Sequence, residues 1–205
     1  MRDNAEKDRL NEWLRREDET SFHRYYVLAY PELLRYGRSL CTDRTVVQDC
    51  VQDLFVWMWQ NTDRLREIEQ PSNYVYMSLR NNVLGTVRQT RKRLQLLDAA
   101  PQSRPGADRV APGEVPEDDP AHQYLERLVA MLPGKQMEVI YLRFYRNKSF
   151  KEIGDIMSVS SQVAQNYAAR ALRKLRGEGD TLKRLVIGHT LSLLFAASLL
   201  RWVLL

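Results

Sequence analysis

The sequence predicts an all-α protein with two small helical domains, at 1–97 and 121–180, joined by a flexible linker at 98–120. Apolar residues recur at helical spacing on both sides of the chain's centre, and the alternation that marks a strand is not sustained anywhere. The central segment holds five of the chain's eight prolines but few large apolar residues, so burial cannot offset the entropy lost on ordering it. A further segment at 181–205 is an apolar C-terminal tail, for which we expect an additional helix.

The clearest helix of the first domain carries a single apolar stripe. The stripe, at the i, i+4, i+7, i+11 spacing of one helix face, is formed by Val47, Val51, Leu54 and Met58. The opposite face is formed by Asp49, Gln52, Asp53 and Val56. Thr42 or Asp43 is expected to cap this helix, because either side chain can accept a free N–H group of the first turn. A second helix is expected from Tyr74 to about Arg93, after a loop at 70–73.

The second domain has the pattern of a helix-turn-helix. Four short helices are expected, at 124–131, 136–144, 150–157 and 161–176, and Ser149 with Glu152 forms a capping box for the third. The turn Ser158–Ser160 joins the last two, and Gly154 leaves room where these helices cross. Such a pair can place its second helix in the major groove of DNA, although a plain helical hairpin has the same features.

Charge and composition restrict the classes of function. The chain carries 31 basic and 26 acidic residues, a net charge of +5. Basic blocks at 78–97 and 164–184 flank the acidic linker, which favours a polyanion that touches both ends; two solvated helix faces are the alternative. The two cysteines, Cys41 and Cys50, form no disulfide framework or zinc motif, and neither a glycine-rich phosphate loop nor a metal-ligand cluster is present. No cofactor is implied, and an enzyme is not expected.

Three motif blocks in order resemble those of one family. The block at 132–176 begins with "LPGKQMEVIYLRF", contains "KEIG", ends in "RALRKLR" and resembles sigma factor region 4. Upstream, "DCVQDLF" at 49–55 lies in a block that resembles regions 2.1–2.2, and "YVYMSLRNNVLGTVRQTRKR" at 74–93 resembles regions 2.3–2.4. The chain thus resembles the extracytoplasmic-function (ECF, group 4) sigma factors of the sigma-70 superfamily. Its motif residues "YG…QDLFVWMW" are most similar to those of members from Bacteroidetes.

The resemblance implies a cytoplasmic specificity subunit of bacterial RNA polymerase. Such a protein binds the clamp helices and flap of the core enzyme, reads the −35 element as duplex, and melts and captures the −10 element. It makes and breaks no covalent bond. The family usually has an anti-sigma factor that covers the polymerase-binding surfaces. A stand-alone helix-turn-helix regulator and a membrane-anchored adaptor are the alternatives.

Each of the three implied contacts falls on a set of residues matched to the family's motifs. The polymerase-binding set is Asp49, Gln52, Asp53, Val56 and Trp57. The −10 set, in which aromatic faces and cations suit unstacked bases and phosphates, is Asn73, Tyr74, Arg80, Asn81, Arg88, Arg91 and Lys92, together with the loop at 70–73. The −35 set divides into base-side residues (Ser160, Ser161, Gln162, Gln165 and Asn166) and phosphate-side residues (Arg170, Arg173 and Lys174).

Two segments depart from the family pattern. Val163, Gln165 and Tyr167 stand where family members frequently have Thr, Lys and Arg, so the −35 contact should be weaker, less salt-sensitive or shifted in sequence preference. The tail at 186–205 has about the length of a membrane span and follows Lys183 and Arg184. His189 and Arg201 count against a span, so membrane contact, packing on a domain and binding of a partner all stay open.

Overall fold

A computed structural model describes residues 2–96, 129 and 131–177, and these residues form helices and connecting turns without a strand. The predicted all-α class is therefore confirmed. The whole linker, most of the helix expected at 124–131, and the whole tail at 181–205 lie outside the described residues. No helix in the described part of the chain is long and apolar enough to cross a membrane.

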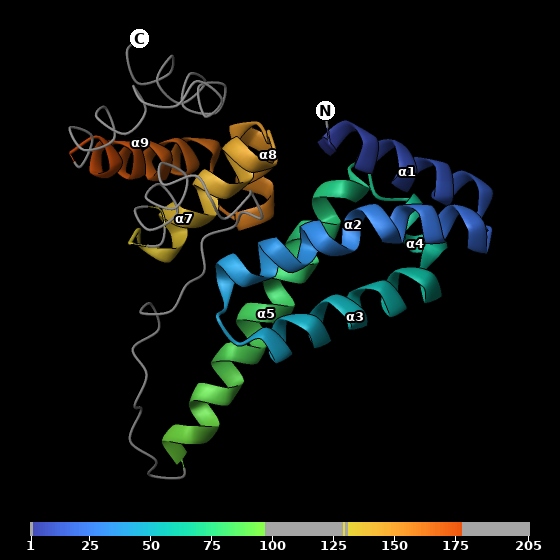
Figure 1. Ribbon diagram of the computed structural model, residues 1–205, viewed down its shortest axis with the longest axis horizontal. Helices are drawn as coiled ribbons and strands as arrows, with labels where there is room; N and C mark the ends of the chain where they lie inside the picture. Colours follow the sequence, from blue (N-terminus) through green and yellow to red (C-terminus); the bar gives the residue numbers. More distant parts are fainter. Residues whose placement is uncertain (1, 97–128, 130, 178–205) are drawn as a thin grey trace, which may run out of the picture.

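The described part of the first domain, residues 2–96, consists of five helices. They are α1 (Arg2–Arg16), α2 (Glu19–Leu40), α3 (Arg44–Gln60), α4 (Thr62–Arg66) and α5 (Pro71–Leu96). Helices α2, α3 and α5 pack on one another, and α1 lies along α2 (Figure 1). Tyr25, Leu33, Val51 and Leu79 are fully buried between them. The domain is thus a helical bundle with one apolar centre.

Helix α3 has the amphipathic pattern expected for it. The four residues of the predicted stripe are buried, and the four on the opposite face are exposed. Of the two predicted caps, Asp43 is the one used, because its side chain accepts the backbone N–H groups of Thr45 at 3.0 Å and Val46 at 3.2 Å. The polar face of α3 is therefore open to a partner.

Helix α5 begins three residues earlier than expected. Pro71 occupies its first position, where the fixed backbone angle of proline suits a helix and the missing N–H group costs nothing. The backbone N–H of Tyr74 bonds to the carbonyl of Gln70 at 3.1 Å, so the first turn is closed. The predicted loop at 70–73 is wrong for residues 71–73, which are helical.

The described part of the second domain comprises α7 (Gly134–Ile140), the π-helical turn η1 (Tyr141–Tyr145), α8 (Phe150–Met157) and α9 (Ser161–Gly177). The sequence predicted one α-helix at 136–144; its second half instead forms the wider π turn, in which the Arg146 N–H reaches the Tyr141 carbonyl at 3.2 Å. The predicted capping box is confirmed, since Ser149 and Glu152 exchange both bonds at 3.2 and 2.8 Å.

The helix-turn-helix geometry is as predicted. Ser158 ends α8 in the left-handed backbone region, with φ of 54°, and so turns the chain toward α9. A Cβ atom built on Gly154 would lie 2.7 Å from the carbonyl oxygen of Val159. Helix α8 therefore approaches the turn as closely as it does only because residue 154 has no side chain.

The two domains pack directly against each other. Helix α8 lies on α5 and α7 lies on α2, as Figure 1 shows for the yellow and orange helices beside the blue and green ones. Val139, Leu142 and Ile153 of the second domain belong to the same buried cluster as Tyr36 and Leu79 of the first. A shared core of this kind was not part of the sequence-based picture of two domains joined by a linker.

Candidate nucleic-acid interface

The first turns of α9 carry exposed polar side chains on one face. These are Ser161, Gln162, Gln165 and Asn166, and Ser160 precedes them, also exposed. The hydroxyl of Ser160 accepts the backbone N–H of Val163 at 3.2 Å and so satisfies one free donor of the helix N-terminus. The amides of Gln165 and Asn166 can both donate and accept, which is the combination that matches an adenine edge. All five residues predicted to face the bases are thus accessible together.

Burial explains why two of the three α9 positions that depart from the family pattern carry no charge. Val163 and Tyr167 are half-buried, and Tyr167 packs against the hydrophobic core. The Nζ atom of Lys135 lies 5.8 Å from the centroid of the Tyr167 ring, within the range of a cation–π contact. Of the three positions that depart from the family pattern, only Gln165 is fully accessible to DNA in this structure.

The second half of α9 is cationic and exposed. Arg170, Arg173 and Lys174 follow the amide-bearing turns along the same helix, in the order expected for base contacts and then phosphate contacts. The Nζ atom of Lys174 also donates to the carbonyl oxygen of Met131 at 2.9 Å. Lys174 therefore has a structural contact in addition to its predicted role.

The C-terminal half of α5 forms the second basic surface. Arg88, Arg91 and Lys92 are exposed there, and Asn81 is exposed about two to three turns closer to the N-terminus of the helix. Figure 1 shows that this end of α5, in light green, extends beyond the neighbouring helices. These four predicted −10 residues are open to solvent, as a nucleic-acid contact requires.

The remaining −10 residues are covered. Asn73 is 6% exposed, and its amide donates to the Gln70 side chain. The Arg80 guanidinium donates from Nε to Glu138 of α7 at 2.7 Å, and the Arg80 side chain is only 12% exposed. Tyr74 is half-buried, with its ring 5.6 Å from that of Trp57. The structure thus separates the predicted −10 set into an exposed basic half and a covered half.

The polymerase-facing set lies on α3. Asp49, Gln52 and Asp53 are exposed, Val56 is 55% exposed, and Trp57 is half-buried against Tyr74. Carboxylate and amide groups beside exposed apolar area form the kind of surface that pairs with a partner's cations and excludes water.

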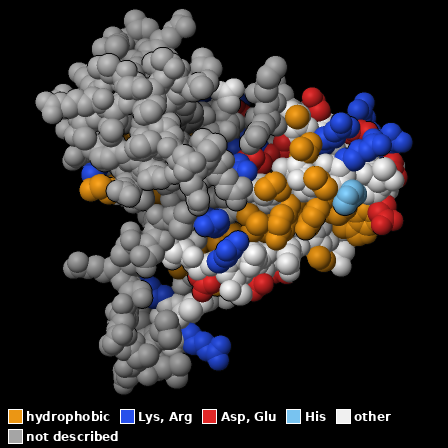
Figure 2. Space-filling view, viewed as in Figure 1, with side chains coloured by type: hydrophobic (Ala, Val, Ile, Leu, Met, Phe, Trp, Pro, Cys, Tyr) orange, Lys and Arg blue, Asp and Glu red, His pale blue; other side chains and the backbone are white. Residues whose placement is uncertain are grey.

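Sequence reasoning missed apolar residues that extend this surface. Val27 and Leu28 of α2 and Trp59 of α3 are 55%, 42% and 46% exposed. Figure 2 shows hydrophobic side chains gathered over this part of the first domain. Trp59 belongs to an aromatic cluster in which its ring lies 5.0 Å from that of Phe22, measured between ring centroids. The aromatic spacing of Phe22, Tyr26 and Tyr30, one turn apart each, was the signal in the sequence that could have located it.

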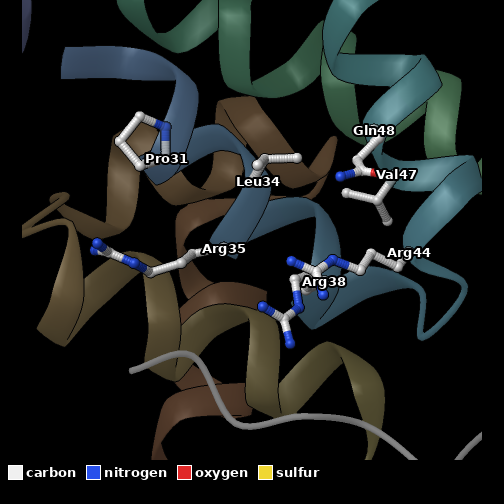
Figure 3. A pocket seen from close by; sticks show the side chains of 7 residues that line it. All are labelled: Pro31, Leu34, Arg35, Arg38, Arg44, Val47 and Gln48. Carbon is white, nitrogen blue, oxygen red and sulfur yellow. The ribbon is translucent and has the colours of Figure 1, made fainter. Parts of the chain in front are cut away.

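A shallow pocket between α2 and the start of α3 is rich in arginine. Its lining comprises Pro31, Leu34, Arg35, Arg38, Arg44, Val47 and Gln48 (Figure 3). Arg35 is paired with Glu32 at 2.8 Å, whereas Arg38 and Arg44 make no ion pair within the described residues. This pocket adds positive charge beside the polymerase-facing helix.

A cluster of buried charged groups, also missed from the sequence, lies between the domains. Glu138 is 3% exposed and accepts bonds from Arg80 and from the Tyr36 hydroxyl, the latter at 2.8 Å. Burial raises the pKa of the Glu138 carboxyl, and the bonds from Arg80 and Tyr36 oppose that rise. Burial opposes the charge of Arg146, but nearby Tyr76 and the Glu6 carboxylate raise its pKa overall. The ion pairs of Glu138 with Arg80 and of Arg146 with Glu6 exist only while the domains are in contact.

Two helical domains with exposed basic faces, one of them ending in a helix-turn-helix, define a DNA-binding protein. The family model for Sigma-70 region 2 matches residues 26–93, and the one for Sigma-70, region 4 matches residues 122–175. The chain therefore belongs to the sigma-70 family and is ECF-like, and its role is that of a sigma factor in promoter recognition. Members of this family are transcription initiation factors and not enzymes. No curated protein matches the sequence.

Proposed function

We propose that this protein binds the core of RNA polymerase and directs initiation by reading the −35 element as duplex and by melting and capturing the −10 element. The observation that carries the proposal is the presence, in order on one chain, of both sigma regions. Each region offers an accessible polar or basic surface of the type that its role requires. The protein acts where chromosomal DNA and polymerase are found, in the cytoplasm.

The −35 contact is assigned to α9. The amides of Gln165 and Asn166 bond to base edges, and Arg170 and Arg173 bind phosphates and hold the helix in register. Val163 and Tyr167 are uncharged and half-buried, so α9 brings fewer cations to the groove than the family pattern would provide. The affinity for DNA therefore depends less on salt.

The −10 contact is assigned to α5 and the polymerase contact to α3. Arg88, Arg91 and Lys92 bind the backbone of the opened strand, and the Tyr74 ring supplies a face for an unstacked base. The acidic and apolar face of α3 binds the clamp helices of the core enzyme, and the second domain binds the flap. An anti-sigma factor is expected to compete for the α3 face.

In vitro transcription with purified core polymerase and a genomic promoter library tests this proposal. We expect transcripts whose start sites share one −35 and one −10 sequence. Asp53→Lys should abolish the complex with core, whereas the same charge change at Asp63, which is 91% exposed on α4, should leave it intact. Duplex binding by the free protein without any core complex would contradict the proposal and favour a stand-alone regulator.

A further inference from the structure

Lys135, in the first turn of α7, is an exposed cation that lies against α9. Its Nζ atom is 5.8 Å from the centroid of the Tyr167 ring, within the range of a cation–π contact. Lys135 forms no ion pair within the described residues, and the Glu138 carboxyl, one turn further along α7, is engaged by Arg80 and Tyr36. The Tyr167 ring therefore holds the Lys135 ammonium in place without neutralising its charge.

The place of Lys135 beside α9 is determined by the packing of α7. Met137 and Ile140 of α7 are buried. They belong to one apolar cluster with Ala171 and Leu172 of α9. Because buried side chains of the two helices pack closely, α7 cannot slide along α9 without losing these contacts. The ammonium thus has a defined position near the middle of α9.

Tyr167 lies in line with two residues of the predicted phosphate-side group. Tyr167, Arg170 and Lys174 are spaced i, i+3, i+7, so they follow one stripe of α9. The stripe is about 10 Å long, and Arg170 and Lys174 are exposed on it. Lys135 adds a third cation at the N-terminal end of the stripe, where α9 itself has an uncharged ring. Cations from two helices therefore form one row beside the amide-bearing turns of α9.

We propose that Lys135 is a contact to a DNA phosphate, which α7 supplies at the place where family members frequently have a cation on α9. The Tyr167 ring acts as the positioning group for this ammonium. The inference rests on the proposed reading of −35 duplex by α9, and it extends that contact by one phosphate on a neighbouring helix. Lys135 thereby replaces one of the positive charges that α9 lacks at positions 165 and 167.

Lysine over a ring is chemically suited to this role. The ammonium group has three N–H donors, and a ring on one side of it leaves donors free on the other. Lysine binds phosphate as a point charge and needs no fixed fork of donors, so a ring that limits the movement of the side chain is sufficient support. A carboxylate in place of the ring would offset the charge that attracts the phosphate, whereas the neutral Tyr167 ring does not.

The salt dependence of duplex binding by the full chain tests this role. The probes are a −35 duplex selected from a promoter library by the parent protein and a duplex of scrambled sequence, and fluorescence anisotropy measures binding. Lys135→Ala should reduce the slope of log affinity against log salt by about 0.9, the value for one phosphate of B-DNA. Its loss of affinity relative to the parent should therefore shrink about 3.5-fold between roughly 50 and 200 mM salt.

Four further variants separate a phosphate contact from a structural role. Lys135→Gln should reproduce the lower slope, and Lys135→Arg, which keeps the charge, should retain the parent slope. Tyr167→Arg in the Lys135→Ala chain returns a cation to α9 itself and should restore the slope. Arg64→Ala, the matched control, removes a charge at an exposed position on α4 and should leave the slope unchanged. A purely structural role of Lys135 would lower the urea midpoint and not the slope.

The two probes distinguish failure of this inference from failure of the proposed function. A parent slope in Lys135→Ala, together with the parent preference for the selected duplex, would overturn the Lys135 contact and leave the −35 assignment of α9 intact. Equal affinity of the parent protein for the selected and scrambled duplexes would contradict −35 reading itself. A slope that falls as much in Arg64→Ala as in Lys135→Ala would show that net charge sets the salt dependence, and would also overturn the proposal.

Discussion

Replacement of Gly154 by alanine should destabilise the helix-turn-helix, whereas the same replacement of Gly85 should stabilise α5. Both glycines lie inside helices, but their surroundings differ. A Cβ atom on Gly154 would lie 2.7 Å from the Val159 carbonyl oxygen and 3.2 Å from the Ser161 nitrogen, while a Cβ atom on Gly85 would meet nothing within 4 Å. Both close atoms at Gly154 belong to the backbone of the turn, so relief requires the turn itself to shift.

The expected magnitudes follow from two opposing effects. Alanine in place of glycine in a helix interior contributes about 1 kcal/mol of stability. Added volume at a tightly packed site costs about 1–3 kcal/mol, and a fixed backbone neighbour places Gly154 toward the upper end of that range. We therefore expect Gly154→Ala to lose about 1–2 kcal/mol of the free energy of unfolding and Gly85→Ala to gain about 1 kcal/mol.

Urea unfolding followed by circular dichroism measures both values, with the slope of the transition used to check that the unfolded states are comparable. Gly154→Ala should also weaken binding of −35 duplex, because a shifted turn moves α9. A Gly154→Ala protein at least as stable as the parent would show that the turn yields freely, and the close approach would then not be a requirement of the fold.

Three further predictions concern the DNA-binding surfaces and the capping of α8. Gln165→Ala should change which −35 sequences are selected from a library, since an amide contributes about 1–3 kcal/mol of base discrimination, whereas Arg173→Ala should weaken all sequences about equally; identical selection profiles would refute the division of α9 into two halves. Arg88→Ala should reduce the slope of log affinity against log salt by about 0.7 on single-stranded −10 DNA, as titration at several salt concentrations will show. Ser149→Ala should cost about 0.5–2 kcal/mol of the free energy of unfolding, because the Ser149 hydroxyl accepts the backbone N–H of Glu152 and alanine cannot; an unchanged urea midpoint would contradict that value.

Features that depend on neighbours in the chain could be predicted from the sequence. The capping box at Ser149, the Asp43 cap and the apolar stripe of α3 each involve residues within a few turns, where helix geometry determines which groups meet. The need for a small residue at Gly154 follows from the short turn after it. The exposed base-facing residues of α9 follow in the same way, because the buried face of that helix is marked by alanine and leucine.

Features that depend on contacts between distant segments could not be predicted. Glu6 and Arg146 are 140 positions apart, and each alone has the appearance of an ordinary solvated charge. The burial of Arg80 depends on where α7 lies, and no local pattern specifies that position. The π turn at 141–145 is equally a response to packing, since Tyr141 and Leu142 on it are buried.

The pairing of Arg80 with Glu138 also affects how the protein encounters the chromosome. A cell holds a large excess of DNA without promoter sequence, and a basic protein with its whole cationic surface exposed would be retained on it. An arginine already bonded to a buried carboxylate adds nothing to that nonspecific attraction. The pairing of Arg80 with Glu138 thus lowers the positive charge that the free chain offers to DNA of any sequence.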